Sequence, residues 1–204
     1  MTGTRKAFSG SKAIRRLVCA LLTLLLVAAD PVTDLQGTAL RNMIISTAEM
    51  IALPFRLARL SAQPADTVLL VPVDGAKVKQ IADTWGASRP GGRIHAGQDI
   101  FARKGTPVRS ATRGYVIDVA RNALGGNVVV IVGAGGRRYY YAHLEAFAAE
   151  IRVGKAVTPD MVIGFVGTSG NAVHTPPHLH FAMYTSMGAV NPLPLLRDRV
   201  SSAP

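Results

Sequence analysis

The pattern of hydrophobic and polar positions changes twice along the chain. Residues 17–29 are uniformly apolar, residues 38–60 mix Leu, Ile, Met and Ala with single charges, and the chain from residue 67 onward alternates short β-branched or aromatic runs with glycine. Short runs bounded by turn residues are typical of β-strands. We predict strands at residues 67–71, 107–110, 115–119, 127–132, 137–144, 162–166 and 178–184. The sequence therefore predicts an all-β domain.

Glycine and proline indicate where the predicted elements turn or end. Gly125-Gly126-Asn127 and Ala134-Gly135-Gly136 each stand between two apolar runs, so we expect antiparallel hairpins there. Pro54 interrupts the pattern of residues 38–60, which predicts one or two amphipathic helical turns broken at that residue. We divide the chain into an N-terminal segment at 1–29, a helical segment with a linker at 30–66, and a β domain at 67–200.

The N-terminal segment predicts export. Five basic residues precede the apolar run, namely Arg5, Lys6, Lys12, Arg15 and Arg16, and this order is typical of a signal peptide. A spanning helix needs about 20 apolar residues, and the run at 17–29 is shorter than that. A retained membrane anchor is therefore the less favoured alternative. We expect processing near Ala29, a location in the periplasm or cell envelope, and at most peripheral membrane contact. Residues 38–60 could lie on a membrane surface, but Glu49 and the small residues favour a segment that packs on the β domain or on a partner.

The net charge of +11 raises the question of an anionic partner. Residues 1–29 carry five basic and no acidic residues, which leaves 11 − 5 = +6 on the rest of the chain. The remaining Lys and Arg are scattered, without a helix-turn-helix, zinc-finger or RNA-binding signature, so we expect no nucleic-acid partner. A basic surface still suits an anionic polymer.

Four of the five histidines fall in three short motifs, His95-Ala-Gly-Gln-Asp99, Tyr141-Ala-His143-Leu and His178-Leu-His180. Residues two apart on a strand project from the same face, so His178 and His180 can share one site while Leu179 faces the core. On a straight strand His95 and Asp99 would lie roughly 13 Å apart, too far for one ion. We expect the chain to bend between them at Gly97. A helical His-Glu-x-x-His arrangement is disfavoured because its glutamate is absent.

These motifs carry a family resemblance. The segments at residues 93–100, 140–144 and 177–181, with the glycine-marked stretches 125–127 and 164–170, resemble the lysostaphin-type (LytM-like) zinc metallopeptidases that cut peptidoglycan cross-bridges. The resemblance spans roughly residues 71–191. It implies an antiparallel sheet of the duplicated hybrid motif type with a metal-binding groove. It also implies that each chain binds one zinc ion through His95, Asp99 and His180. The same resemblance implies that His143 and His178 are the catalytic pair.

Some positions near the motifs carry separate expectations. Ala182 stands where such proteins commonly have a glutamate, which removes a group that could support His180. His174 lies in a loop rich in Gly, Thr and Pro and is expected to be solvated. Strict alternation along a strand places Tyr139 and Tyr141 on the face of His143.

The chemistry of these residues fits a hydrolase. A catalytic zinc usually has three protein ligands and one open position, and two His with one Asp meet that count. Two further imidazoles can transfer protons. We expect an exported zinc endopeptidase acting on stem or cross-bridge peptides of peptidoglycan. The alternative is a non-catalytic wall-binding or amidase-activating protein on the same fold, which would be expected to have lost one of the five site residues. The scissile bond and the oligomeric state stay open.

Overall fold

The computed structural model describes residues 34–200, so the predicted signal segment lies outside the described residues. Within 34–200 there are one long helix, α2 (Asp34–Ser61), and thirteen strands. The strands are β1 (Leu69–Leu70), β2 (Ser88–Arg89), β3 (Arg93–Ile94), β4 (Gln98–Phe101), β5 (Pro107–Arg109), β6 (Gly114–Asn122), β7 (Gly126–Val132), β8 (Arg138–Phe147), β9 (Ala156–Val157), β10 (Val162–Val166), β11 (His178–Thr185), β12 (Gly188–Val190) and β13 (Leu196–Arg197). Among the described helices, none combines the length and apolar character needed to cross a membrane.

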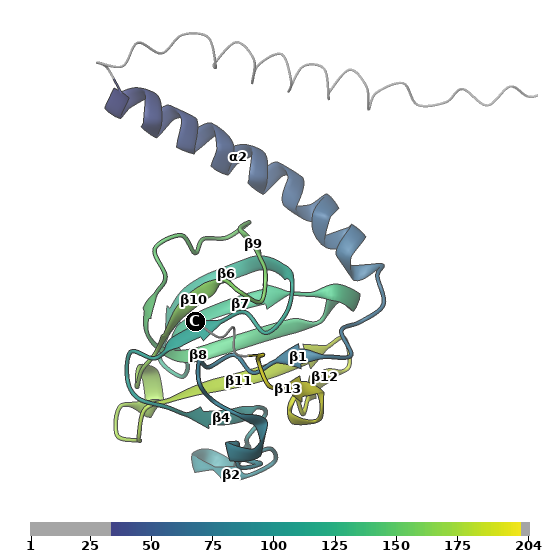
Figure 1. Ribbon diagram of the computed structural model, residues 1–204, viewed down its shortest axis with the longest axis vertical. Helices are drawn as coiled ribbons and strands as arrows, with labels where there is room; N and C mark the ends of the chain where they lie inside the picture. Colours follow the sequence, from purple (N-terminus) through teal and green to yellow (C-terminus); the bar gives the residue numbers. More distant parts are fainter. Residues whose placement is uncertain (1–33, 201–204) are drawn as a thin grey trace, which may run out of the picture. The chain divides into compact units, whose positions relative to one another are not determined.

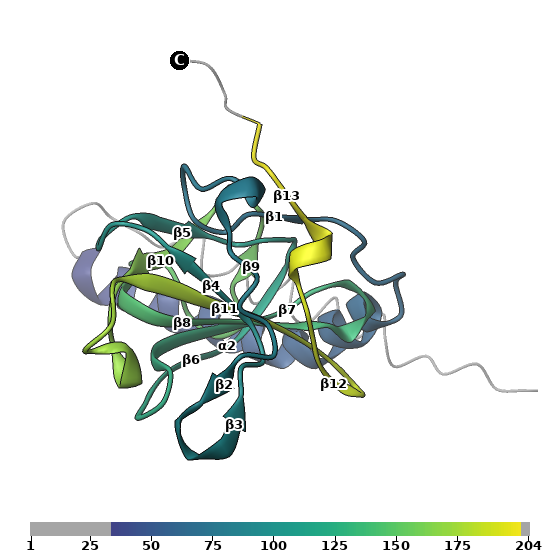
Figure 2. The same cartoon turned by 90° about the horizontal axis from the view of Figure 1, so that it is seen from below.

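The main sheet is antiparallel, as predicted. Its central order is β12-β11-β8-β7-β6-β9, while β4 pairs with β11, and β10 pairs with both β5 and β8. Figures 1 and 2 show β6, β7, β8 and β11 lying side by side in that order. Both predicted hairpins are present, because β6 pairs with β7 and β7 with β8. All seven predicted strands overlap observed ones, and six strands were not predicted: β2, β3, β4, β9, β12 and β13. Each of these six has only two to four residues, which gives too little pattern.

Helix α2 continues through Pro54, so the predicted break at that residue is wrong. Proline removes one backbone N–H from the helix. Its ring is exposed here, and water can reach the carbonyl that loses its partner. The chain forms two compact units, one ending at Thr47 and one beginning at Ala48. Within the second unit, Leu53 is buried and Glu49 pairs with Arg152 at 2.8 Å before Pro54, and the guanidinium of Arg56 lies 5.8 Å from the ring centroid of Tyr115 after it. Contacts on both sides of Pro54 therefore hold the last turns of the helix.

One face of the sheet forms the hydrophobic core. Tyr139, Tyr141, Leu179 and Phe181 are completely buried there, and the rings of Tyr141 and Phe181 lie 5.1 Å apart between centroids. Leu179 therefore faces the core as predicted. Tyr139 and Tyr141 do so as well, and the prediction that they share a face with His143 is wrong.

A β-bulge at His143 explains that error. Leu144 pairs with Asn127 and Tyr141 with Val129, so two residues of β8 stand opposite one residue of β7. Such a bulge shifts the alternation of side chains by one position. His143 has φ 61°, the one non-glycine residue of the described chain with a left-handed backbone. Alternation would place His143 on the core face with Tyr141. Because of the bulge, His143 lies on the opposite face of the sheet.

Arg199 ties the C-terminal segment to the domain. Its guanidinium donates to the carbonyl oxygens of Val71 at 2.8 Å, Pro159 at 2.7 Å and Ser110 at 2.8 Å. Arg199→Ala is expected to lower the free energy of unfolding by about 2 kcal/mol, because charge-assisted bonds are lost and carbonyl groups are left unpaired. Urea unfolding measures the change. Arg197→Ala is the matched control, because within residues 34–200 the Arg197 side chain bonds only to the nearby carbonyls of Pro194 and Leu196. An equal loss in both variants would contradict the prediction.

Candidate functional site

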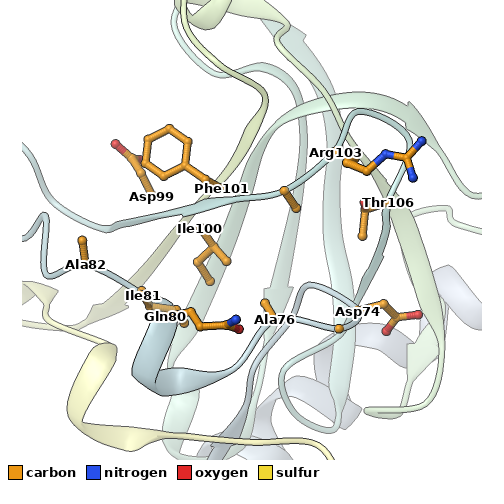
Figure 3. A pocket seen from close by; sticks show the side chains of 12 residues that line it. Asp74, Ala76, Gln80, Ile81, Ala82, Asp99, Ile100, Phe101, Arg103 and Thr106 are labelled. Carbon is orange, nitrogen blue, oxygen red and sulfur yellow. The ribbon is translucent and has the colours of Figure 1, made fainter.

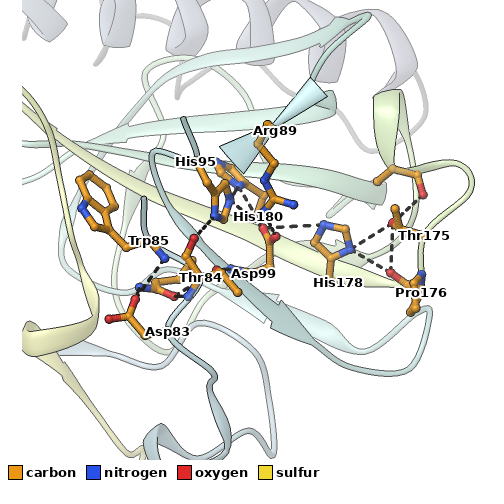
Figure 4. A network of polar contacts seen from close by, with 12 residues as sticks. Asp83, Thr84, Trp85, Arg89, His95, Asp99, Thr175, Pro176, His178 and His180 are labelled. Atoms are coloured by element: carbon orange, nitrogen blue, oxygen red, sulfur yellow. Dashed lines mark hydrogen bonds and ion pairs between the residues drawn. The ribbon is translucent and has the colours of Figure 1, made fainter. Parts of the chain in front are cut away.

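Three predicted site residues converge where β4 meets β11. The antiparallel register places His180 directly opposite Asp99, and His95 reaches the same point from the bend between β3 and β4. His95 Nε2 lies 3.0 Å from Asp99 Oδ1 and 2.8 Å from His180 Nδ1. His180 Nδ1 lies 3.1 Å from Asp99 Oδ1. Figure 4 shows the three side chains pointing toward one another, and they form a group that could hold a metal ion.

The donor chemistry of this group fits zinc. His95 Nδ1 donates to the carbonyl oxygen of Thr84 at 2.7 Å, so in the neutral ring Nε2 presents a lone pair to the group. Two imidazole nitrogens and a carboxylate oxygen then face one another, which is a donor set that suits a shared zinc ion. Tetrahedral zinc with bonds of 2.0–2.1 Å separates neighbouring ligand atoms by about 3.3 Å. Outward movements of a few tenths of an ångström would reach that spacing.

Gly97 provides the space for this convergence. The chain bends between His95 and Asp99 as predicted, but Gly97 does not have the positive φ that only glycine favours. A Cβ atom at this position would lie 2.7 Å from His180 Cε1 and 2.8 Å from the carbonyl oxygen of Phe181. The glycine is therefore required because the ligand ring of β11 passes directly against the backbone.

The electrostatics favour an ionised Asp99 carboxylate and lower the pKa of the His95 imidazole. Burial tends to raise the pKa of Asp99, but the hydrogen bond with His180 and the nearby histidine charges outweigh burial and hold the pKa well below its usual range. Arg89 binds the other carboxylate oxygen, Oδ2. Burial lowers the pKa of His95. These are the protonation states that metal binding requires.

The other two predicted residues lie beside the ligand group. The rings of His143 and His178 are 5.0 Å apart, and His178 Nε2 lies 3.8 Å from Asp99 Oδ1. His143 Nδ1 donates to the carbonyl of Ser169 at 2.9 Å and His178 Nδ1 to that of Pro176 at 2.8 Å, leaving each Nε2 as an acceptor. Burial lowers the pKa of His143 to about 4, so its ring is neutral at physiological pH. Its left-handed backbone is the kind of strain that collects at functional sites.

Comparison with known proteins places this arrangement in a family. Residues 93–192, which include all five predicted site residues, match peptidase family M23. These residues form a peptidase M23 domain.

The M23 relatives include wall enzymes. The chain is 42% identical over 125 residues to the L-Ala–D-Glu endopeptidase of Bacillus subtilis, covering 56% of this chain and 38% of that enzyme. The catalytic domain of lysostaphin from Staphylococcus simulans superimposes with a TM-score of 0.51 at 28% identity, covering 57% of this chain and 92% of that domain. A zinc-containing peptidase from Vibrio cholerae superimposes with a TM-score of 0.52 at 30% identity, covering 63% of this chain and 39% of that peptidase. The chain thus spans less than half the length of the Bacillus enzyme.

Two residues of the M23 site were missed by the sequence analysis. Arg89 enters through the short β2–β3 hairpin, whose pairing places it opposite Arg93. Thr84 binds His95 through its carbonyl and accepts the backbone N–H of Asp99 on its hydroxyl at 3.0 Å. Gln98 in turn accepts the backbone N–H of Thr84 at 2.9 Å. No pattern in the sequence indicates these contacts, because they depend on loop geometry.

Arg89 is expected to hold Asp99 in the orientation that a metal needs. Arg89→Ala should reduce the zinc affinity of the M23 domain by about 10-fold, since groups that orient ligands typically contribute that much. Competition with a chromophoric chelator measures the affinity. Arg93→Ala is the control, because the exposed Arg93 side chain bonds only to the carbonyl of Pro90. Unchanged affinity in Arg89→Ala would show that the ion pair does not orient the carboxylate.

A cavity of about 410 Å³ lies between β4 and residues 74–82 of the M23 chain. Figure 3 shows Ile100 pointing toward Ile81 and Ala76, whereas Asp99 and Phe101 turn to the other side of β4. The cavity is thus separated by β4 from the Asp99 carboxylate. His174 is exposed, as predicted, and contributes nothing to the ligand group.

Proposed function

We propose that this chain is an exported zinc endopeptidase that hydrolyses stem or cross-bridge peptides of peptidoglycan. The observation that carries the proposal is the convergence of His95 Nε2, Asp99 Oδ1 and His180 Nδ1, with two more buried histidines alongside. Membership of a peptidase family and a relative named as an L-Ala–D-Glu endopeptidase support the reaction and the substrate class.

In this proposal His95, Asp99 and His180 hold one zinc ion per chain. When bound, zinc supplies a Lewis acid that polarises a carbonyl and makes water easier to deprotonate. His143 and His178 transfer protons during the reaction. Each ring is oriented by a backbone carbonyl at Nδ1, so its Nε2 can accept a proton from the attacking water. The protonated ring can then donate to the carbonyl oxygen or the leaving amine.

The alternative is a non-catalytic activator or wall-binding protein on the same fold. Such a protein has no need for a complete ligand group or for two further buried histidines. All five residues are present and lie within one site, which favours the enzyme. The missing glutamate at Ala182 does not separate the ligands, because His180 is held opposite Asp99 by the strand register.

Digestion of purified sacculi tests the activity. The zinc-loaded protein is expected to release muropeptides with one newly formed amino terminus, and mass spectrometry identifies the bond. The variant His178→Ala serves as the inactive control. A wild-type protein that binds sacculi without releasing peptides would favour the activator or wall-binding alternative.

Export is proposed from the N-terminal sequence alone, in which basic residues precede the apolar run at 17–29. We expect a mature amino terminus near Ala29 and a location in the periplasm or cell envelope. Sequencing of the mature protein and carbonate extraction of membranes test both points. An intact chain that contains Met1 and resists carbonate would identify a retained anchor instead.

A further inference from the structure

Helix α2 exposes a stripe of large apolar side chains. Within the second unit, the exposed fractions are 49% for Met50, 68% for Ile51 and 78% for Phe55. Ile51, Phe55 and the exposed Ala58 are spaced four and three residues apart, which places them along one side of a helix. Met50 lies about 100° round the helix from Ile51, at the edge of this stripe nearer Gly154 of the domain. Exposed apolar residues gathered in this way mark an interaction surface.

A different side of the same helix is already packed against the domain. Leu53 is 8% exposed, Glu49 pairs with Arg152, and the guanidinium of Arg56 lies 5.8 Å from the ring centroid of Tyr115. These contacts all lie within residues 48–200. The helix therefore packs against the domain with one side and exposes the stripe on another. Packing against the domain does not explain why the exposed side is apolar.

The charges of the helix point to an anionic occupant. Glu49 is the one acidic residue between Asp34 and Asp66, and its carboxylate is paired with Arg152. The exposed charge next to the stripe is Arg59, which follows Ala58 and is positive. Arg56 is exposed as well, although its guanidinium lies over the ring of Tyr115. An apolar stripe with cationic neighbours matches the boundary between acyl chains and anionic headgroups.

A lipid surface fits better than a partner helix. Pro54 stands in the middle of the stripe, where a coiled-coil seam needs long side chains that insert between those of its partner. A bilayer imposes no such shape. Before processing, the signal-like sequence at residues 5–29 would bring the chain to a membrane, which places a bilayer surface within reach of the helix. We propose that the stripe of Ile51, Phe55 and Ala58, with Met50 at its edge, docks on the surface of an anionic bilayer and keeps the peptidase domain beside it.

A local fluorescent reporter tests this surface in the full chain. Cys19→Ser removes the single native cysteine, and Phe55→Cys or Ile51→Cys then accepts an environment-sensitive nitrobenzoxadiazole label. With vesicles of phosphatidylcholine containing phosphatidylglycerol, emission at both positions is expected to rise severalfold and to be quenched by brominated acyl chains. The same label at Met187→Cys, a position 96% exposed on the β11–β12 turn, should stay unchanged.

Flotation of the labelled proteins with the vesicles makes each outcome decisive. Unchanged emission at positions 51 and 55 in protein that floats would show that another segment binds, and failure to float would overturn the proposal directly. Emission that rises with protein concentration in the absence of lipid would assign the stripe to a second copy of the chain. Two label positions guard against one variant that misfolds, and none of these readouts depends on peptidase activity.

Discussion

His180→Ala is expected to lower the affinity for zinc by about 100-fold or more. The change removes one of three converging donor atoms and leaves only His95 Nε2 and Asp99 Oδ1 facing each other. Loss of a group that merely orients a ligand costs about 10- to 100-fold, so loss of a ligand itself should cost at least the upper value. Zinc content after dialysis and competition with a chelator measure the effect.

His174→Ala is the matched control for that experiment. It also removes one imidazole, but from an exposed loop position, and it should keep about one zinc per chain as expected for the unchanged ligand set. Full occupancy in His180→Ala would overturn the ligand assignment. Loss of zinc from both variants would instead indicate that the fold had been damaged.

His178→Ala and His143→Asn are expected to lower turnover by about 100-fold or more while zinc stays bound, because each removes a proton-transfer group without removing a ligand. Asparagine is chosen at position 143 because it tolerates the left-handed backbone found there, which alanine would strain. Release of peptides from sacculi gives the rate, and metal analysis of the same sample gives the occupancy. Wild-type rates in both variants would reject the catalytic pair.

The parts of the site that follow the period of a strand could be predicted from the sequence. His178 and His180 share a face because they are two residues apart, and Leu179 faces the core for the same reason. The prediction for Tyr139 and Tyr141 used the same rule and was wrong, because the bulge at His143 interrupts the alternation. A bulge leaves no mark in the hydrophobic pattern, so its position is visible only in the paired strands.

Other features depend on contacts between distant segments. Pro54 has a strong local preference to end a helix, but the contacts of Glu49 and Arg56 with the domain hold the helix on both sides of it. Arg89 lies ten residues before Asp99 in a loop, and only the folded hairpin brings its guanidinium to the carboxylate. Local preference and spacing predict an element or a pair, whereas tertiary packing decides which side chains complete the site.

The cross-strand pairing of Asp99 with His180 has a consequence for how the protein responds to metal. Within residues 34–200, β4 has β11 as its single strand neighbour, and the predicted ion would join the same two strands through their side chains. An ion in this position would connect β4 to β11 at the edge of the sheet. Ion binding and the pairing of β4 with β11 would then stabilise each other. Withdrawal of zinc would then loosen the strand that carries Asp99, and the protein would lose the shape of its binding site together with its reactivity.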